Sequence, residues 1–224
     1  MYWQNSLLNE YNDVRKFQLD VFSDIAFKRN CAKNQPITFT KYDRLLIIME
    51  GRVKISIANE NGVEKILYIL SDGDLIGEID FFNKINHDYE VIPLVDTVIG
   101  VLERKDVMAK IEANPIIYEH IIKSIIRKYQ ITSSQLTDNV FMDSDGKIAS
   151  VLLRIAEQEG ETVGEHVEYF YLKHQDIADL LGCSRVTVSR AINKFKCEGI
   201  INVKDHKMMI LDKEKLEKKY IERL

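Results

Sequence analysis

The 224-residue chain has little of the residues that mark several special classes of protein. It has only 3 Cys, 3 Pro and 10 Gly, which argues against a disulfide framework and against a Pro/Gly-rich or collagen-like chain. Hydrophobic runs such as Leu45–Met49 are short. A membrane helix needs about 20 such residues in succession. Met1–Glu10 lacks the basic stretch and apolar core of a signal peptide. We therefore expect a cytoplasmic protein with reduced cysteines and no membrane contact.

The residues that are present form the composition of a globular protein, 46% hydrophobic and 29% charged. The net charge is −4, but Tyr171–Leu224 holds 12 Lys and Arg against 8 Asp and Glu, so this segment alone is basic. A basic C-terminal quarter behind an acidic body indicates a small anion-binding module attached to a larger domain.

Short strands with frequent turn signals predict an antiparallel β-roll or sandwich in the N-terminal half. Apolar and polar side chains alternate in Gly51–Ala58, and the turn Asn59–Gly62 leads into a returning strand at Glu64–Leu70. Two further strands are predicted at Val91–Leu94 and Thr97–Leu102.

A change of period predicts one long helix over Asn114–Val140. Its apolar side chains repeat at an average of about 3.5 residues, the spacing of a coiled-coil seam. Such a face must be covered, either by the β domain or by a second copy of the helix. We expect the second copy, with a dimer interface of Tyr118, Ile121, Ile122, Ile125, Tyr129 and Leu136. The polar stretch Met142–Gly146 then predicts a linker to a helix over Lys147–Glu159.

The segment Lys173–Gly199 predicts two short helices joined by a tight turn. Gly182 suits the left-handed residue that ends the first helix, and Ser184 suits the N-cap of the second. Two short strands, Ile200–Val203 and Met208–Leu211, follow as a β-hairpin wing.

The chemistry of this segment lies on the exposed side of its second helix. Arginine can donate two hydrogen bonds to the O6 and N7 acceptors of guanine, and valine can contact the methyl group of thymine. The predicted base contacts are Ser184, Arg185, Val186, Ser189 and Arg190. The predicted phosphate contacts are Lys173, Thr187, Lys194 and Lys204. The segment therefore predicts binding to double-stranded DNA.

This segment closely resembles the winged helix-turn-helix of the Crp/Fnr family of bacterial transcription regulators, and the similarity extends over nearly the whole chain. Glu50–Lys54, Asn61–Gly62 and Asp72–Glu78 resemble the glycine-marked turns of the family's N-terminal β-roll, and the long helix resembles its dimerisation helix. Within the family, the chain looks most similar to a YeiL-like branch.

The resemblance implies an α+β protein with a β-roll of the cyclic-nucleotide-binding type at residues 1–112 and a dimerisation helix at 113–141. A linker at 142–146 and a winged helix-turn-helix domain at 147–224 would follow. The resemblance also implies a homodimer without enzymatic activity that reads a palindromic DNA site, with half-sites about 34 Å apart. RNA polymerase is a further partner that it implies.

The family's sensing features are incomplete in this chain. The resemblance places an effector pocket at Gly77, Glu78, Tyr89 and Glu90. Cyclic-AMP-binding members carry a phosphate-binding Arg-Ser where this chain has Tyr89-Glu90, and no Lys or Arg occurs between Lys84 and Arg104. A cyclic phosphate would meet uncompensated carboxylates there, so cyclic AMP is disfavoured.

Other cofactors are also disfavoured. Cys31 is the only Cys before residue 183, so one chain cannot supply four thiolates to an iron–sulfur cluster. His87–Glu90 predicts a solvated loop rather than a haem or metal pocket. A cupin-like metalloenzyme is the remote alternative to a transcription regulator. The chain lacks the His-x-His spacing that such an enzyme needs.

We expect no metal, and two alternatives stay open for the β-roll. It holds an unidentified small effector, or the protein is a constitutive regulator with a vestigial sensor domain. Val186 stands where family members often have Glu, so the operator is expected to differ from the familiar ones.

Overall fold

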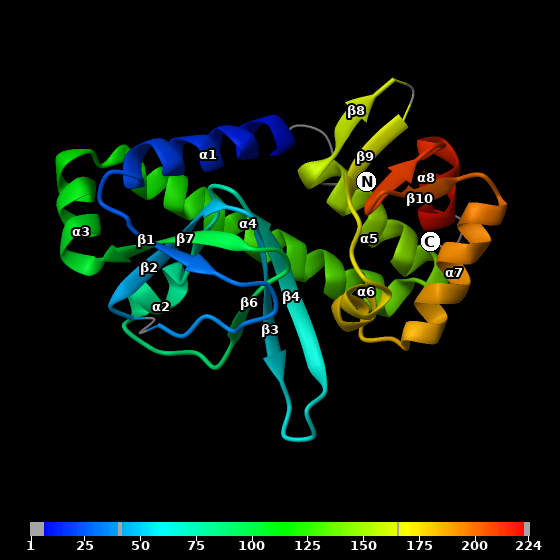
Figure 1. Ribbon diagram of the computed structural model, residues 1–224, viewed down its shortest axis with the longest axis horizontal. Helices are drawn as coiled ribbons and strands as arrows, with labels where there is room; N and C mark the ends of the chain where they lie inside the picture. The colour runs from blue at the N-terminus through cyan, green and yellow to red at the C-terminus, as the bar shows by residue number, and fades with distance from the viewer. Residues whose placement is uncertain (1–6, 40–41, 165, 222–224) are drawn as a thin grey trace. The chain divides into compact units, whose positions relative to one another are not determined.

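A computed structural model describes residues 7–39, 42–164 and 166–221 (Figure 1). The first six residues of the stretch considered for a signal peptide lie outside this description, as do the last three of the chain. The chain forms two compact units that divide between Thr132 and Ser133. The prediction of a mixed α+β fold is confirmed.

The N-terminal unit begins with a helix, α1 (Leu7–Phe22), that the sequence patterns did not predict. Two antiparallel sheets follow, with strand orders β1-β7-β2-β5 and β4-β3-β6, and they confirm the predicted antiparallel roll. The strands are β1 (Phe27–Cys31), β2 (Arg44–Glu50), β3 (Arg52–Ala58), β4 (Glu64–Ser71), β5 (Leu75–Ile76), β6 (Glu90–Pro93) and β7 (Thr97–Glu103). Short helices α2 (Glu78–Asn83) and α3 (Arg104–Ala113), also unpredicted, precede the long helix α4 (Ile116–Phe141).

The β3–β4 hairpin projects from the roll (Figure 1) and shows how a local turn sets the strand register. The Asn59 side chain accepts hydrogen bonds from the backbone N–H groups of Asn61 and Val63, at 3.0 and 2.9 Å. Gly62 has a φ of 74°, which glycine adopts at little cost. The turn thereby places Ile57 opposite Lys65 and Ala58 opposite Glu64.

One core of the roll joins α1 and α4 to the first sheet. Phe22, Leu45 and Phe81 are fully buried in it, together with Ile117 and Ile121 from α4. Ile121 has only 1% of its surface exposed, so its assignment to a dimer interface was wrong. The apolar side chains of α4 cover more of its surface than a dimer interface needs. One side of this apolar band, which includes Ile121, packs on the β-roll of the same chain.

The C-terminal unit is a winged helix-turn-helix with an antiparallel sheet of order β10-β11-β9-β8. Its helices are α5 (Ser144–Glu159), α6 (His174–Leu181), α7 (Arg185–Cys197) and α8 (Lys213–Ile221). Its strands are β8 (Glu161–Val163), β9 (His166–Phe170), β10 (Ile201–Lys204) and β11 (Lys207–Ile210).

The junction between α4 and α5 is shorter than the predicted linker. Residues 144–146 are helical, because Asp143 caps α5 and its carboxylate accepts a hydrogen bond from the Gly146 N–H at 2.9 Å. The linker prediction was therefore wrong for these three residues. Asp138 near the end of α4 also bonds to α5, at 2.7 Å from the Ser150 hydroxyl and 2.8 Å from Arg154 Nη1.

Candidate nucleic-acid interface and ligand cavity

The turn between α6 and α7 follows from two local signals. Gly182 ends α6 in the left-handed conformation, with a φ of 67°. Ser184 caps α7, and its hydroxyl accepts a hydrogen bond from the Thr187 N–H at 3.1 Å. Four apolar side chains of α7 are buried at helical spacing, namely Val188, Ala191, Ile192 and Phe195. Burial of this face determines which side chains α7 leaves exposed.

The predicted base contacts separate into two groups. Arg185, Val186 and Arg190 are exposed with no capping role, whereas the Ser184 hydroxyl is occupied by the cap and lies 2.9 Å from the Thr187 hydroxyl. The Ser189 hydroxyl is half-buried and bonds to His174 Nδ1 at 2.7 Å. Burial, aided by Arg185 and Lys196, lowers the pKa of His174.

Sequence reasoning missed Asn193. This exposed residue lies three positions after Arg190 and seven after Val186, so the three share one face of α7. The helical spacing was the signal that could have found it.

The predicted phosphate contacts also differ in their availability. Lys173 and Lys204 are exposed, at the N-cap of α6 and in the wing. Lys194 instead lies 2.5 Å from the carboxylate of Asp145 on α5. The hydrogen bond that Lys194 donates to Asp145 raises the pKa of Lys194.

A cavity of about 350 Å³ opens in the β-roll. Its wall includes Gly77, Glu78 and Tyr89, three of the four predicted pocket residues. Glu90 is exposed and does not line the cavity, so that assignment was wrong; it begins strand β6, where neighbouring side chains point to opposite sides. The predicted solvated loop contributes to the wall through His87 and Asp88. The remaining wall residues are Ile55, Ile57, Leu67, Tyr68, Leu70, Ile76, Ile79, Asp80 and Lys128.

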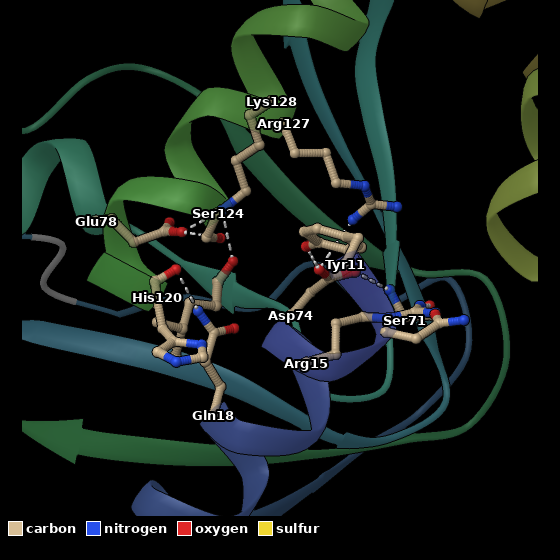
Figure 2. Close-up of polar contacts among 12 residues, drawn as sticks. Tyr11, Arg15, Gln18, Ser71, Asp74, Glu78, His120, Ser124, Arg127 and Lys128 are labelled. Atoms are coloured by element: carbon tan, nitrogen blue, oxygen red, sulfur yellow. Dashed lines mark hydrogen bonds and ion pairs between the residues drawn. The ribbon is translucent and has the colours of Figure 1, made fainter. Parts of the chain in front are cut away.

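One ion pair connects this wall to α4. The Lys128 ammonium lies 2.5 Å from a Glu78 carboxylate oxygen and donates to the Leu75 carbonyl at 2.8 Å. The Ser124 hydroxyl donates to the same Glu78 oxygen at 2.7 Å (Figure 2). Both ends of the ion pair are buried, so Glu78 links the cavity wall directly to α4.

A second buried cluster joins α1 to α4 (Figure 2). Asp74 accepts hydrogen bonds from Arg127 Nη1 at 3.0 Å, from the Ser71 N–H at 2.9 Å and from the Tyr11 hydroxyl. Further along α1, the Gln18 amide donates to the His120 carbonyl of α4 at 3.3 Å. These contacts hold α1 and the turn after β4 against α4.

Comparisons with known proteins match both units of the fold. Residues 32–114 match the cyclic nucleotide-binding domain, and residues 146–219 match the Crp-like helix-turn-helix domain. The cAMP-activated global transcriptional regulator CRP of Salmonella typhimurium is 30% identical over 164 residues, which are 72% of this chain and 78% of that protein. The chain belongs to the Crp/Fnr family of transcription regulators.

A second relative and a solved structure are also similar to this chain, the structure in fold alone. The CRP-like cAMP-activated global transcriptional regulator of Mycobacterium tuberculosis is 29% identical over 178 residues, 79% of this chain and 80% of that one. A variant of CooA from Carboxydothermus hydrogenoformans has the same fold, with a TM-score of 0.74 at 22% identity, covering 90% of this chain and 94% of that one. This Crp/Fnr protein is thus a DNA-binding transcription regulator with a sensor-type β-roll.

Crp/Fnr regulators act as dimers, and α4 of this member has an exposed apolar face. Of the predicted interface residues, Tyr118, Ile122, Tyr129 and Leu136 have between 42% and 71% of their surface exposed. Ile126, which lay beside the predicted seam, is also exposed. Ile125 is half-buried against the core of its own roll.

The described residues of this Crp/Fnr protein lack two further features. None of these residues forms a helix long and apolar enough to cross a membrane. Within the same described ranges, no three His, Cys, Asp or Glu side chains group as a metal site.

Proposed function

We propose that this Crp/Fnr regulator is a homodimer that reads a palindromic operator through α7 and responds to a small molecule in the β-roll cavity. The exposure of Arg185, Val186 and Arg190 on one helix, whose opposite face is buried, is the observation that carries the operator reading. It acts by binding in the cytoplasm rather than by catalysis, and RNA polymerase is its partner in transcription.

The exposed side chains of α7 suit the edges of base pairs in the major groove. Arg185 and Arg190 can each donate two hydrogen bonds to guanine, and Val186 can contact a thymine methyl group. Asn193 can form two hydrogen bonds with adenine. Lys173 and Lys204 carry phosphate contacts, which add affinity without sequence preference. Lys194 reaches a phosphate only after it leaves Asp145.

The exposed apolar face of α4 supports the homodimer. Tyr129 and Leu136 have 71% and 68% of their surface exposed, and a second α4 would bury both. A twofold dimer presents two α7 helices to half-sites one turn of DNA apart, about 34 Å.

The charges of the cavity support an effector other than cyclic AMP. Lys128 is the one Lys or Arg among its wall residues, and its ammonium is already bound to Glu78. A phosphate in the cavity would also meet Asp80 and Asp88. Because Lys128 and Ser124 both lie on α4, a ligand that shifts Glu78 changes the relative stability of two positions of α4.

The test is selection of bound duplexes from random DNA, with and without a metabolite extract. We expect a palindrome, and a change in the bound fraction when the effector is present. A sequence selected without twofold symmetry would contradict the homodimeric reading, and an unchanged bound fraction would favour the constitutive alternative.

Two variants then separate base contacts from phosphate contacts. Arg190→Ala should cost roughly 1–3 kcal/mol on the selected duplex and little on random DNA. Lys204→Ala should weaken both duplexes equally and reduce the salt slope by about one unit. Equal losses on both duplexes for Arg190→Ala would make Arg190 a phosphate contact.

A further inference from the structure

The β-roll cavity combines an aliphatic wall with a charged end. Ile55, Leu70 and Ile76 are buried wall residues that offer only hydrocarbon to a ligand. The charged and ionisable wall residues are Glu78, Asp80, His87, Asp88 and Lys128. A ligand that fits has an apolar body and one polar group. The volume of the cavity, about 350 Å³, is near the lower end of the roughly 300–1,000 Å³ that small-molecule sites have.

The charges at this end do not cancel. Lys128 and Glu78 form a buried pair whose charges offset each other. Asp80, buried and with 1% of its surface exposed, accepts a hydrogen bond from the His87 N–H at 3.0 Å and pairs with the His87 ring. Asp88 adds a second carboxylate. The wall is therefore negative whether His87 is neutral or protonated.

We infer that this cavity selects small organic cations, namely an apolar or aromatic body bearing a protonated amine, over nucleotides and organic acids. The inference rests on the proposed function, because it takes this cavity to be the effector site. A carboxylate or phosphate in the same place would face Asp80 and Asp88 with Lys128 already neutralised, and like charges repel, most strongly beside the buried Asp80.

Two tyrosine rings in the wall favour the same class of ligand. Tyr68 and Tyr89 both line the cavity, and the face of a tyrosine ring attracts a cation. Burial raises the pKa of the Tyr68 phenol, and Glu78 and Asp80 add to the effect. The pKa of the Tyr89 phenol is also raised, mainly by burial and to a lesser extent by Asp80. The carboxylates of Glu78 and Asp80, which add to the effect of burial on both phenols, would attract an ammonium group.

Three probes with the same ring test the inference: 2-phenylethylamine, 2-phenylethanol and phenylacetate. They carry a cation, a neutral hydroxyl and an anion on a phenyl group. Calorimetric titration of the full-length protein should show the amine binding at least about tenfold more tightly than the acid, with the alcohol between them. Equal binding of amine and acid, tighter binding of the acid, or no amine binding at millimolar concentration would each overturn the inference.

Variants connect the preference to the carboxylates. Asp88→Asn changes an exposed side chain, so the fold is retained, and amine affinity should fall about three- to tenfold. Asp80→Asn should lower it further, while 2-phenylethanol affinity changes little in either variant. Glu60→Gln removes an exposed carboxylate of the hairpin tip, outside the cavity wall, and should leave amine affinity unchanged. An unchanged amine affinity in both Asp variants would overturn the inference.

DNA binding by the same preparation separates this inference from the proposed function. Duplex binding without any amine preference would refute the cation inference alone. An amine preference without sequence-selective duplex binding would support the cavity chemistry and contradict the proposed operator reading.

Discussion

The guanidinium of Arg127 lies over the ring of Tyr11, 3.6 Å from its centroid. Arg127 belongs to α4 and Tyr11 to α1, and both bond to the fully buried Asp74. A buried ion pair adds little net stability when complete, but loss of one partner leaves an uncompensated charge. The position of α1 on α4 therefore depends on all three side chains.

Asp74→Asn should destabilise the protein by about 3 kcal/mol, because Arg127 then stays buried without a counter-charge. Urea unfolding measures the loss in free energy of unfolding. Asp72→Asn is the matched control, since Asp72 lies in the same turn as Asp74 but is exposed, and it accepts a hydrogen bond from the Gly51 N–H; the change should cost about 1 kcal/mol or less. Adding Arg127→Met to Asp74→Asn should recover part of the stability, and no recovery would contradict the ion-pair account.

Alkaline pH should destabilise the protein partly through Tyr11. Burial, together with Asp74, raises the pKa of Tyr11 in the folded protein. The stabilisation is thus complete below the unfolded pKa of about 10, and it is lost as pH rises because the unfolded chain releases the proton first. Each such tyrosine contributes a fall of up to about 1.4 kcal/mol per pH unit. Unfolding titrations above about pH 10 should give a shallower slope for Tyr11→Phe, and an identical slope would refute this role.

Charges on the exposed face of α4 should prevent dimerisation without unfolding the chain. Ile122 and Leu136 have 52% and 68% of their surface exposed, so Ile122→Glu/Leu136→Glu should be monomeric by light scattering at micromolar concentration. Burial of each side chain in a dimer is worth roughly 1.5–3 kcal/mol. Gln130→Glu adds a charge beside the apolar face of the same helix and should remain dimeric. A dimeric double variant would show that the interface lies elsewhere.

Release of Lys194 from Asp145 should strengthen DNA binding. Asp145→Asn removes the carboxylate that lies 2.5 Å from the Lys194 ammonium. Lys194 can then contact a phosphate, so affinity should rise several-fold and the salt dependence should steepen by about one unit. Fluorescence anisotropy at two salt concentrations measures both.

The controls for this prediction isolate Lys194. Glu161→Gln removes an exposed charge from β8 of the same unit and should have a smaller effect. Asp145→Asn/Lys194→Ala should lose the gain. If the double variant keeps the gain, Lys194 is not the group that Asp145 restrains.

Local signals made the helix-turn-helix predictable. Gly182 and Ser184 act within four residues of themselves, one as a left-handed helix end and the other as a cap. The β3–β4 hairpin is predictable for the same reason, because Asn59 and Gly62 build its turn. Such interactions need no knowledge of the rest of the chain.

The contacts across the β-roll had no such signal. Tyr11 and Asp74 are 63 positions apart, and Lys128 and Glu78 are 50 apart. Nothing in the neighbours of Tyr11 identifies it as a partner of a buried carboxylate. The contact of α1 with α4 and the role of Lys128 in the cavity were missed for this reason.

The sequence by itself determined the family, the order of roll, long helix and winged helix-turn-helix, and the exposed arginines of α7, because periodicity and caps act over one or two turns. Only the tertiary structure decided how the apolar band of α4 is divided, with Ile121 in the core of its own roll and Ile122 exposed. It also decided that Tyr89 faces the cavity while Glu90 does not. These outcomes depend on which surfaces distant segments cover, and burial of a side chain is a property of the packed molecule rather than of its neighbours in the chain.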